Sequence, residues 1–250
     1  MRIFAVANQK GGVGKTTTCV NLTAALKARG CRVLLVDLDP QGNSTSGIGA
    51  DKLSGSTVYD VISGNVPARD AVRHTDYGDL IASNKELAGA EIELVGVNDR
   101  ETIIRRALEP LRSDYDYIII DCPPSLGLIT LGALCAADGV IVPVQCEYFA
   151  LEGLSDLIYT LRMVRSRLNT NLDLDGILLT MYDSRTNLSA QVAEEVKRHF
   201  PGKMFGAVIP RNVRLSEAPS FGRPIFDYDR SSRGAEAYLR LADEITRRFG

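Results

Sequence analysis

The residues with the clearest chemistry form one short stretch, Asn8–Thr17, which reads Asn-Gln-Lys-Gly-Gly-Val-Gly-Lys-Thr-Thr. Its glycines allow the backbone to approach an anion closely and to point successive N–H groups at it. Lys15 would reach the β- and γ-phosphates of a bound nucleotide, and the hydroxyl of Thr16 would ligate Mg²⁺. The residue types and their spacing therefore predict a phosphate-binding loop.

The segments on either side of this stretch indicate how it is positioned. Ile3–Ala7 is apolar and partly β-branched, which is typical of a buried parallel strand. Thr18–Arg29 carries its apolar residues at a helical spacing. A strand, a Gly-rich turn and a helix in this order distinguish a phosphate loop from a chance cluster of glycines, and the helix N-terminus adds its dipole.

The loop departs from the common pattern G-x-x-x-x-G-K-[ST] at two positions. Gln9 replaces the first glycine, and a second lysine, Lys10, lies five residues before Lys15. This pattern resembles the deviant Walker A motif of the ParA/MinD family of P-loop ATPases. The resemblance implies ATP and Mg²⁺ as cofactors, and it implies that Lys10 reaches across a nucleotide-sandwich dimer to the partner's ATP. The implied phosphate contacts are Lys10, Gly11, Gly12, Val13, Gly14, Lys15, Thr16 and Thr17.

Carboxylates follow two further buried strands, Cys31–Asp37 and Tyr115–Asp121. Ligands of open α/β sheets bind at the carboxyl ends of the strands. Asp39 resembles the aspartate of the family's second acidic motif, which positions or activates the attacking water; beside Pro40, it would otherwise be only a turn residue. Asp121 resembles a Walker B aspartate, which binds Mg²⁺, usually through a water.

The resemblance extends from Ala5 to Glu236, and the stretch Cys122–Gly127 (Cys-Pro-Pro-Ser-Leu-Gly) is similar to the ParA and Soj branch. The MinD branch typically has Ser-Pro-Ala-Gly there. The implied function is that of a chromosome- or plasmid-partitioning ATPase, cytoplasmic and associated with the nucleoid. The implied cycle consists of an ATP-bound homodimer, non-specific binding of double-stranded DNA, and hydrolysis stimulated by a ParB-type centromere-binding protein.

Two late loops follow predicted strands, at Thr180–Asn187 and Ile209–Pro219. In the family, such segments hold the adenine and present arginines to DNA. The implied adenine contacts are Met181, Pro210 and Asn212, and the implied DNA contacts are Arg185 and Arg214. The alternative for these arginines is that they are solvated or cap helices.

Alternating strands and helices predict an α/β fold with a doubly wound, mostly parallel sheet, in one domain over residues 1–250. We expect residues 44–79 to be loops, apart from a short helix near Val58–Ile62. The remaining predicted strands are Asp79–Ser83, Gly139–Val144, Leu174–Met181 and Phe205–Pro210. The remaining predicted helices are Asp99–Leu111, Ala150–Leu168, Ser189–Phe200 and Gly234–Phe249.

The charge of the chain is unevenly distributed. Residues 1–184 hold 17 basic and 23 acidic residues, a net of −6, whereas residues 185–250 hold 12 and 8, a net of +4. Such asymmetry points to contact with a polyanion, or to a solvated C-terminal surface. The five cysteines form no C-x-x-C pair, which favours buried, reduced thiols.

Membrane association is not expected from this sequence. The segment Met1–Ala7 runs directly into the phosphate loop and shows no signal peptide. The uncharged run Cys122–Ala137 is too short and too interrupted by proline to span a bilayer. The last helix alternates apolar and charged residues as a core-facing helix does. Two other functions remain open: a MinD-like membrane-surface ATPase, and a metabolic P-loop ligase of the dethiobiotin-synthetase type.

Overall fold

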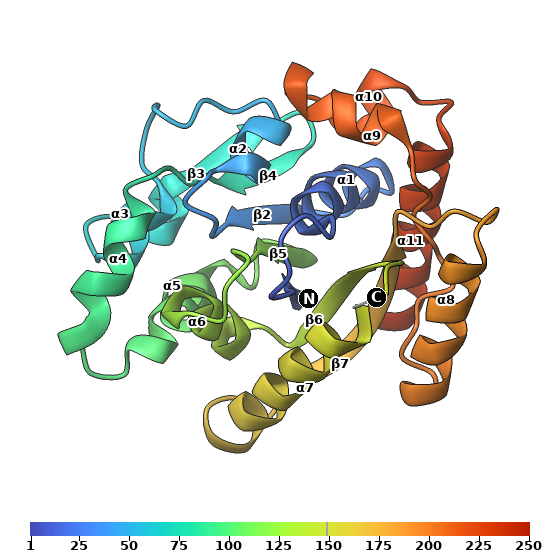
Figure 1. The fold of residues 1–250 in the computed structure, drawn as a ribbon. Coiled ribbons are helices and arrows are strands. Elements are labelled where there is room, and N and C mark those ends of the chain that lie inside the picture. Colours follow the sequence, from blue (N-terminus) through green and yellow to red (C-terminus); the bar gives the residue numbers. More distant parts are fainter. Residues whose placement is uncertain (149) are drawn as a thin grey trace.

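The computed structural model describes residues 1–148 and 150–250, and its centre is a seven-stranded sheet in the order β3-β4-β2-β5-β1-β6-β7 (Figure 1). Only β3 is antiparallel to its neighbour. The sheet therefore confirms the predicted α/β fold. Its strands are β1 (Arg2–Val6), β2 (Val33–Asp37), β3 (Val72–Thr75), β4 (Gly78–Ile81), β5 (Tyr117–Asp121), β6 (Gly139–Gln145) and β7 (Asp173–Thr180).

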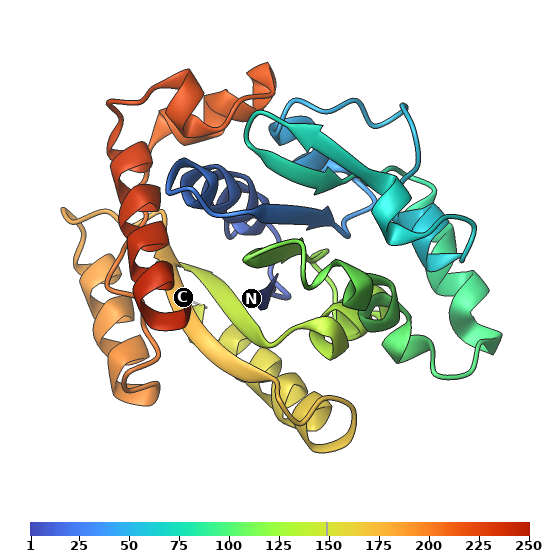
Figure 2. The ribbon, with the colours of Figure 1, turned by 180° about the vertical axis from the view of Figure 1, so that it is seen from behind.

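Helices cover both faces of the sheet (Figures 1 and 2). They are α1 (Lys15–Ala28), α2 (Asn43–Gly47), α3 (Val58–Ile62), α4 (Leu87–Glu93), α5 (Ile103–Leu108), α6 (Leu128–Ala136), α7 (Ala150–Arg167), α8 (Asn187–His199), α9 (Val213–Glu217), α10 (Ile225–Tyr228) and α11 (Arg233–Phe249). In β1, Phe4 and Val6 pack on the face that α1, α10 and α11 cover. Ile3 and Ala5 point to the other face, which α3 to α8 cover. This alternation explains why the strand is apolar throughout.

The C-terminal helix α11 faces the core, as its sequence predicts. Tyr238, Leu241 and Ile245 are fully buried against α1 and the sheet. Among the described residues, no helix is both long enough and apolar enough to cross a bilayer.

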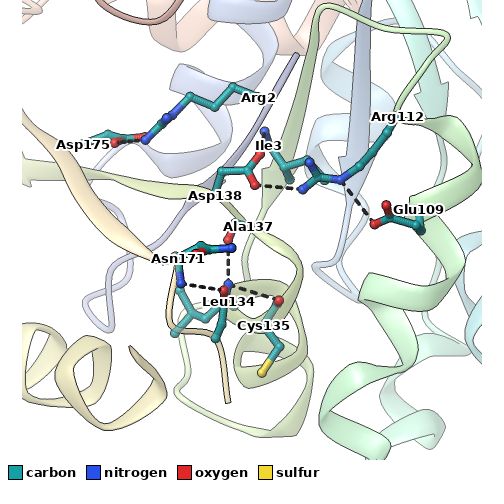
Figure 3. Close-up of polar contacts among 11 residues, drawn as sticks. Arg2, Ile3, Glu109, Arg112, Leu134, Cys135, Ala137, Asp138, Asn171 and Asp175 are labelled. Atoms are coloured by element: carbon teal, nitrogen blue, oxygen red, sulfur yellow. Dashed lines mark hydrogen bonds and ion pairs between the residues drawn. The ribbon is translucent and has the colours of Figure 1, made fainter. Parts of the chain in front are cut away.

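Ion pairs and hydrogen bonds link neighbouring segments at the amino ends of the strands (Figure 3). Arg2 in β1 donates to both carboxylate oxygens of Asp175 in β7, at 2.9 and 2.5 Å. Asp138, just before β6, accepts from the backbone N–H of Ile3 at 2.8 Å and from the guanidinium of Arg112 at 2.8 Å. These side chains occupy the end of the sheet opposite the phosphate loop, so the carboxyl ends of the strands are left for a ligand.

The predicted strand Phe205–Pro210 was wrong, because the structure has only isolated bridges here, from Met204 to Ile177 and from Pro210 to Tyr182. The physical reason is the carboxylate of Glu244 on α11. It accepts hydrogen bonds from the backbone N–H groups of Gly206 and Ala207, at 3.0 Å each. Those donors therefore do not continue a ladder along β7.

The region 44–79 contains more structure than its sequence predicts. The short helix α3 spans Val58–Ile62 as predicted, but the loop prediction missed α2 and the antiparallel hairpin of β3 and β4. The predicted strand Asp79–Ser83 is β4, which begins one residue earlier and ends at Ile81. The predicted helix Asp99–Leu111 is α5 flanked by 3₁₀ turns.

The cysteines are free thiols, and four of the five are buried. Cys19 and Cys122 lie behind the phosphate loop, where burial raises the pKa of each thiol. Cys31, between α1 and β2, is half-buried. The predicted burial is therefore found for every cysteine except Cys31.

Candidate nucleotide site

The stretch that joins β1 to α1 has the backbone of a phosphate loop. Gly12 and Gly14 adopt left-handed φ angles of 75° and 91°, a conformation that glycine enters without steric cost. Helix α1 begins at Lys15, directly after the second of these glycines. The top of the loop, from Gln9 to Gly12, lies at the surface, while Val13 is buried.

Two buried polar side chains that sequence reasoning missed hold this loop in place. The amide of Asn8 donates to the carbonyl of Pro143 at 2.7 Å, and its oxygen accepts from the N–H of Lys10 at 2.9 Å. The hydroxyl of Thr180, at the end of β7, donates to the carbonyl of Val13 at 2.8 Å. The loop is thus fixed to both β6 and β7. The only sequence signal for Asn8 and Thr180 is that each is a polar residue next to an apolar strand.

Lys15 lies beneath the loop and is 7% exposed. Its ammonium donates to the carbonyl of Lys10 at 3.1 Å. Burial lowers the pKa of Lys15, and the nearby carboxylate of Asp121 acts in the opposite direction. A buried ammonium held by a single carbonyl has donors to spare, so the position suits an anion such as a phosphate.

Asp121, at the end of β5, brings together the predicted metal ligands. Its Oδ2 accepts from the hydroxyl of Thr16 at 2.8 Å and from that of Ser44 at 2.6 Å. Its Oδ1 is buried and has no hydrogen-bond partner among the residues described. Burial raises the pKa of Asp121. Ser44 was missed by the sequence reasoning, because only the fold brings α2 to this carboxylate.

This arrangement fits Mg²⁺ held together with nucleotide phosphates. Within residues 1–148 and 150–250, no cluster of three or more His, Cys, Asp or Glu side chains could hold a metal alone. Mg²⁺ typically binds through one or two carboxylates, several waters and substrate phosphates. The unpartnered Oδ1 of Asp121 and the hydroxyl of Thr16 are the oxygens that such an ion would use.

The carboxylate of Asp37 holds the segment that follows β2, including Asp39, through hydrogen bonds. Its Oδ1 accepts from the N–H of Asp39 at 3.1 Å, and its Oδ2 accepts from the N–H and the hydroxyl of Thr45, both at 2.8 Å. Asp37 is fully buried beside Asp121, its neighbour across the β2–β5 ladder. Burial and that neighbouring charge raise its pKa. Asp39 itself accepts from the N–H of Gln41 at 2.9 Å, so its catalytic role stays a prediction.

Lys10 forms an ion pair within the chain that the sequence did not predict. Its ammonium lies 2.8 Å from the carboxylate of Glu147, which follows β6, and both side chains are exposed, at 39% and 44%. The amide of Gln145 also donates to Glu147. In this structure, therefore, Lys10 pairs within its own chain.

The residues expected to hold adenine come from two loops that are bonded to each other. Met181 has a left-handed φ of 51°, which is rare for a residue with a side chain. The N–H of Tyr182 donates to the carbonyl of Ile209, and the carbonyl of Tyr182 accepts from the N–H of Arg211, at 3.0 Å each. Pro210 bridges to Tyr182 in the same connection. The adenine contacts remain predictions.

The side chain of Asn212 caps the short helix α9. Its oxygen accepts from the backbone N–H of Arg214 at 2.8 Å. The two N–H groups of the amide and the second lone pair of its oxygen are left for the predicted adenine contact.

Both arginines predicted to touch DNA are exposed and ion-paired. Arg185 forms a two-point pair with Asp183, at 2.9 and 2.7 Å. Arg214 pairs with Glu217 at 2.9 Å and with Asp229 at 3.5 Å. The pairing lowers the pKa of Asp183 and raises that of Arg185. Their DNA role remains a prediction.

A Gly-rich loop between a strand and a helix, with buried aspartates at the carboxyl edge of a parallel sheet, defines a P-loop nucleotide-binding protein. The family described as "AAA domain" matches residues 1–174. The chain is 58% identical to the sporulation initiation inhibitor protein Soj of Bacillus subtilis, over 98% of each chain. It is 52% identical to the chromosome partitioning protein ParA of Myxococcus xanthus, over 99% of this chain and 88% of that one. The chain belongs to the ParA/Soj family of P-loop ATPases.

Solved structures are similar to this chain in fold. A Mycobacterium smegmatis protein, described as cobyrinic acid a,c-diamide synthase with bound ATP analog and magnesium, is 42% identical with a TM-score of 0.87, over 99% of this chain and 95% of that one. The cell division ATPase MinD of Pyrococcus furiosus is 27% identical with a TM-score of 0.81, over 98% of each chain.

Proposed function

We propose that this protein is an ATP-dependent DNA-partitioning ATPase. Mg-ATP binds the monomer, and two monomers close face to face over their nucleotides. The dimer binds double-stranded DNA without sequence preference. Hydrolysis, stimulated by a ParB-type centromere-binding protein, returns the dimer to monomers. The names of the relatives support the partitioning role, because proteins named ParA or Soj cover essentially the whole chain.

The observation that carries the proposal is the division of the phosphate loop into an enclosed part and an exposed part. Lys15 and Asp121 are buried under the loop, where one nucleotide and its metal ion would be held. Lys10, Gly11 and Gly12 lie on the outer surface of the same loop. A second subunit could therefore reach the exposed part while the enclosed part keeps its own nucleotide.

The chain's residues have separate tasks in this proposal. Lys15 neutralises the β- and γ-phosphates, while Thr16 and Asp121 hold Mg²⁺, which supplies further charge neutralisation when bound. Asp39 orients the attacking water, and the hydrogen bond from its N–H to Asp37 keeps it at the end of β2. Phosphoryl transfer needs mainly positioning and charge stabilisation, which this set of groups provides.

Lys10 must exchange partners during the cycle. It leaves Glu147 and contacts the phosphates bound by the other subunit. Because both side chains are about two-fifths exposed, the pair contributes only about 0.2–1 kcal/mol, as exposed ion pairs do. Contact with a triphosphate offsets that loss easily.

Further parts of the proposal concern location and organisation. The 250 residues act as one domain, in the cytoplasm and on the nucleoid. Arg185 and Arg214 meet DNA phosphates. Their present ion pairs are exposed, so a phosphate could replace the carboxylate partner at little cost.

Light scattering after size exclusion tests the proposal. We expect a dimer with a non-hydrolysable ATP analogue and a monomer with ADP. Lys10→Ala should remain monomeric with the analogue. A matched control is Lys27→Ala, because Lys27 is an exposed lysine of α1 that bonds the carbonyl of Thr75, far from the loop. A wild-type protein that stays monomeric with the analogue would contradict the sandwich dimer.

Two other functions are separated by simple assays. Similarity to the diamide synthase raises the alternative of a metabolic P-loop enzyme. ATP hydrolysis and ADP release without any added metabolite would exclude this alternative. The MinD relative raises the question of a membrane-surface ATPase. Co-sedimentation with liposomes in the presence of ATP would support that function over the proposed one.

A further inference from the structure

Two adjacent hydroxyls of α2 contact two different aspartates of the candidate site. Ser44 donates to Oδ2 of Asp121 at 2.6 Å, and Thr45 donates to Oδ2 of Asp37 at 2.8 Å. Ser44 and Thr45 are both fully buried. The two aspartates are neighbours in turn, because they are paired residues at the carboxyl ends of β2 and β5. Helix α2, which lies against α1 and β2 (Figure 1), therefore connects the expected metal ligand Asp121 to Asp37.

Thr45 also connects α2 to the end of β4. Its hydroxyl oxygen accepts from the backbone N–H of Ser83 at 3.0 Å, and Ser83 lies two residues after β4 and is fully buried. A backbone N–H can only donate, so the hydroxyl must accept from Ser83 and give its own proton to Asp37. The direction of both hydrogen bonds is therefore fixed, and a valine side chain could make neither of them.

Asp37 continues this path to the backbone of Asp39. Its other carboxylate oxygen accepts from the N–H of Asp39 at 3.1 Å. A chain of hydrogen bonds thus runs from Ser83 through Thr45 and Asp37 to Asp39, and none of these residues is more than 9% exposed. Hydrogen bonds in such an enclosed place are stronger than those that water can reach. The path therefore holds the start of the turn that carries Asp39.

The end of the same turn lies directly against Ser83. The N–H of Gly42 donates to the carbonyl of Asp39 at 2.8 Å, and Gly42 has a left-handed φ of 60°. A Cβ atom at Gly42 would lie only 2.7 Å from the carbonyl oxygen of Ser83. The N–H of Ser83 therefore acts on the turn through Thr45, and its carbonyl contacts the turn at Gly42. These are two independent contacts between the end of β4 and the turn.

We infer that Thr45 is a positioning residue for ATP hydrolysis, which fixes the place of Asp39 through Asp37 and ties it to the metal ligand Asp121 through α2. This role rests on the proposed function, in which Asp39 orients the attacking water. A displacement of about 1 Å in a positioned group can cost about a hundredfold in rate. The loss of one hydroxyl that does not touch the nucleotide can therefore be read in the hydrolysis rate.

Steady-state hydrolysis and calorimetry with the non-hydrolysable analogue test this role together. Thr45→Val should lower kcat by about ten- to a hundredfold. The Kd of the analogue should stay unchanged, because Lys15 and the loop glycines keep their positions. Thr45→Ser keeps the hydroxyl and should restore kcat.

Hydrogen exchange of the nucleotide-free protein, followed by mass spectrometry, gives a readout that does not depend on activity. In Thr45→Val the N–H of Ser83 loses its acceptor, so peptides over residues 37–45 and 80–86 should exchange faster than in wild type. Peptides over β1 and α1 should exchange as in wild type. Unchanged exchange in all of these peptides would contradict the path from β4 to Asp39.

The matched control is Thr18→Val. The hydroxyl of Thr18 is also fully buried and lies 3.2 Å from one side-chain partner, the hydroxyl of Tyr238 on α11, so its loss should leave kcat unchanged. Gly42→Ala is a second test that leaves Thr45 intact, and it decides the question if Thr45→Val does not fold. Its added Cβ would meet the carbonyl of Ser83, so kcat should fall here too.

The outcomes separate this role from the proposed function. If Thr45→Val and Gly42→Ala keep the wild-type kcat while Asp39→Ala is slow, Thr45 has no positioning role and the proposed function stands. If Asp39→Ala also hydrolyses ATP normally, the proposed role of Asp39 fails as well. Equal losses of kcat in Thr45→Val and Thr18→Val, or a weaker Kd with normal kcat in Thr45→Val, would overturn the positioning role.

Discussion

Asp121→Asn should stabilise the nucleotide-free protein while removing its function. The buried carboxylate has one oxygen bonded by Thr16 and Ser44 and another with no partner in the described structure. Burial raises the pKa of Asp121, which means that the charged form is disfavoured in the folded state. An amide keeps the oxygen that the two hydroxyls need and removes the buried charge. It also removes the charge that helps to raise the pKa of Asp37.

The magnitude follows from the cost of an unsatisfied buried group. Such a group costs about 1–3 kcal/mol, and more when it is charged. The amide nitrogen is still unpaired, so we expect a gain of about 1–2 kcal/mol in the free energy of unfolding. In a chain of 250 residues, this corresponds to a rise in Tm of about 2–8 °C.

The gain should depend on pH with a defined sign. Because the pKa of Asp121 is raised in the folded state, the folded protein binds the proton of this carboxyl group more tightly than the unfolded chain does. The free energy of unfolding of wild type therefore falls as the pH rises from about 4, the pKa of an aspartate in the unfolded chain, through the raised pKa of Asp121 in the folded protein. The amide has no such dependence. The difference in Tm between Asp121→Asn and wild type should be small at pH 4 and largest at pH 8.

The assay is thermal melting in EDTA without nucleotide, repeated with Mg-ATP. Ligand binding stabilises wild type by about 2.7 kcal/mol at a hundredfold excess over Kd, so the order of the two proteins should reverse with Mg-ATP. The matched control is Asp116→Asn: Asp116 pairs with Arg32, which lowers its pKa, so this variant should not be stabilised. An Asp121→Asn protein that melts below wild type in EDTA at pH 8 would refute the reasoning.

Five further variants have expected outcomes. Lys15→Ala should abolish nucleotide binding, measured by calorimetry, because the loop loses its central positive charge; near-normal ATP affinity would contradict the P-loop assignment. Asp39→Ala should bind ATP but hydrolyse it slowly, leaving a persistent dimer, and normal turnover would make Asp39 a turn residue only. Gly12→Val should bind nucleotide and fail to dimerise, because a side chain would stand on the exposed loop at a φ of 75°; light scattering that shows a normal dimer would count against face-to-face closure. Arg185→Ala and Arg214→Ala should each flatten the salt slope of DNA binding by about 2 in a symmetric dimer, while ATP-dependent dimerisation survives; unchanged slopes would remove both residues from the DNA surface.

Much of the fold was predictable because its signals are local. The apolar strands β1, β2 and β5 each end at a distinctive polar motif, so their existence follows from the sequence. The segment Phe205–Pro210 has strand-like residues, and the distant Glu244 binds the N–H groups of Gly206 and Ala207, which interrupts the pairing of the segment with β7. Strand β3, and with it the hairpin that it forms with β4, was missed because β3 is only four residues long and mostly polar.

The candidate site also has residues that local sequence patterns predict and residues that they do not. The loop glycines, Lys15 and the strand-end aspartates are recognisable by spacing alone. Thr180 and Glu147 contact the loop from residues more than 130 positions away in the sequence, and no local pattern reports such contacts. The pair of Arg185 with Asp183 joins residues only two positions apart, and the sequence analysis did not predict it.

The uneven burial of the thiols has a practical consequence for labelling this protein. Burial raises the pKa of all five thiols, so the difference between them is access: four cysteines are buried, and Cys31 is half-buried. A thiol-reactive fluorophore added to the folded protein should therefore attach at Cys31, the half-buried cysteine. Cys31 lies just before β2, at the amino end of the strand, whereas the nucleotide site lies at the carboxyl end. A dye at this position would report on tumbling and on association between subunits without blocking the nucleotide, and no cysteine would have to be introduced by mutation.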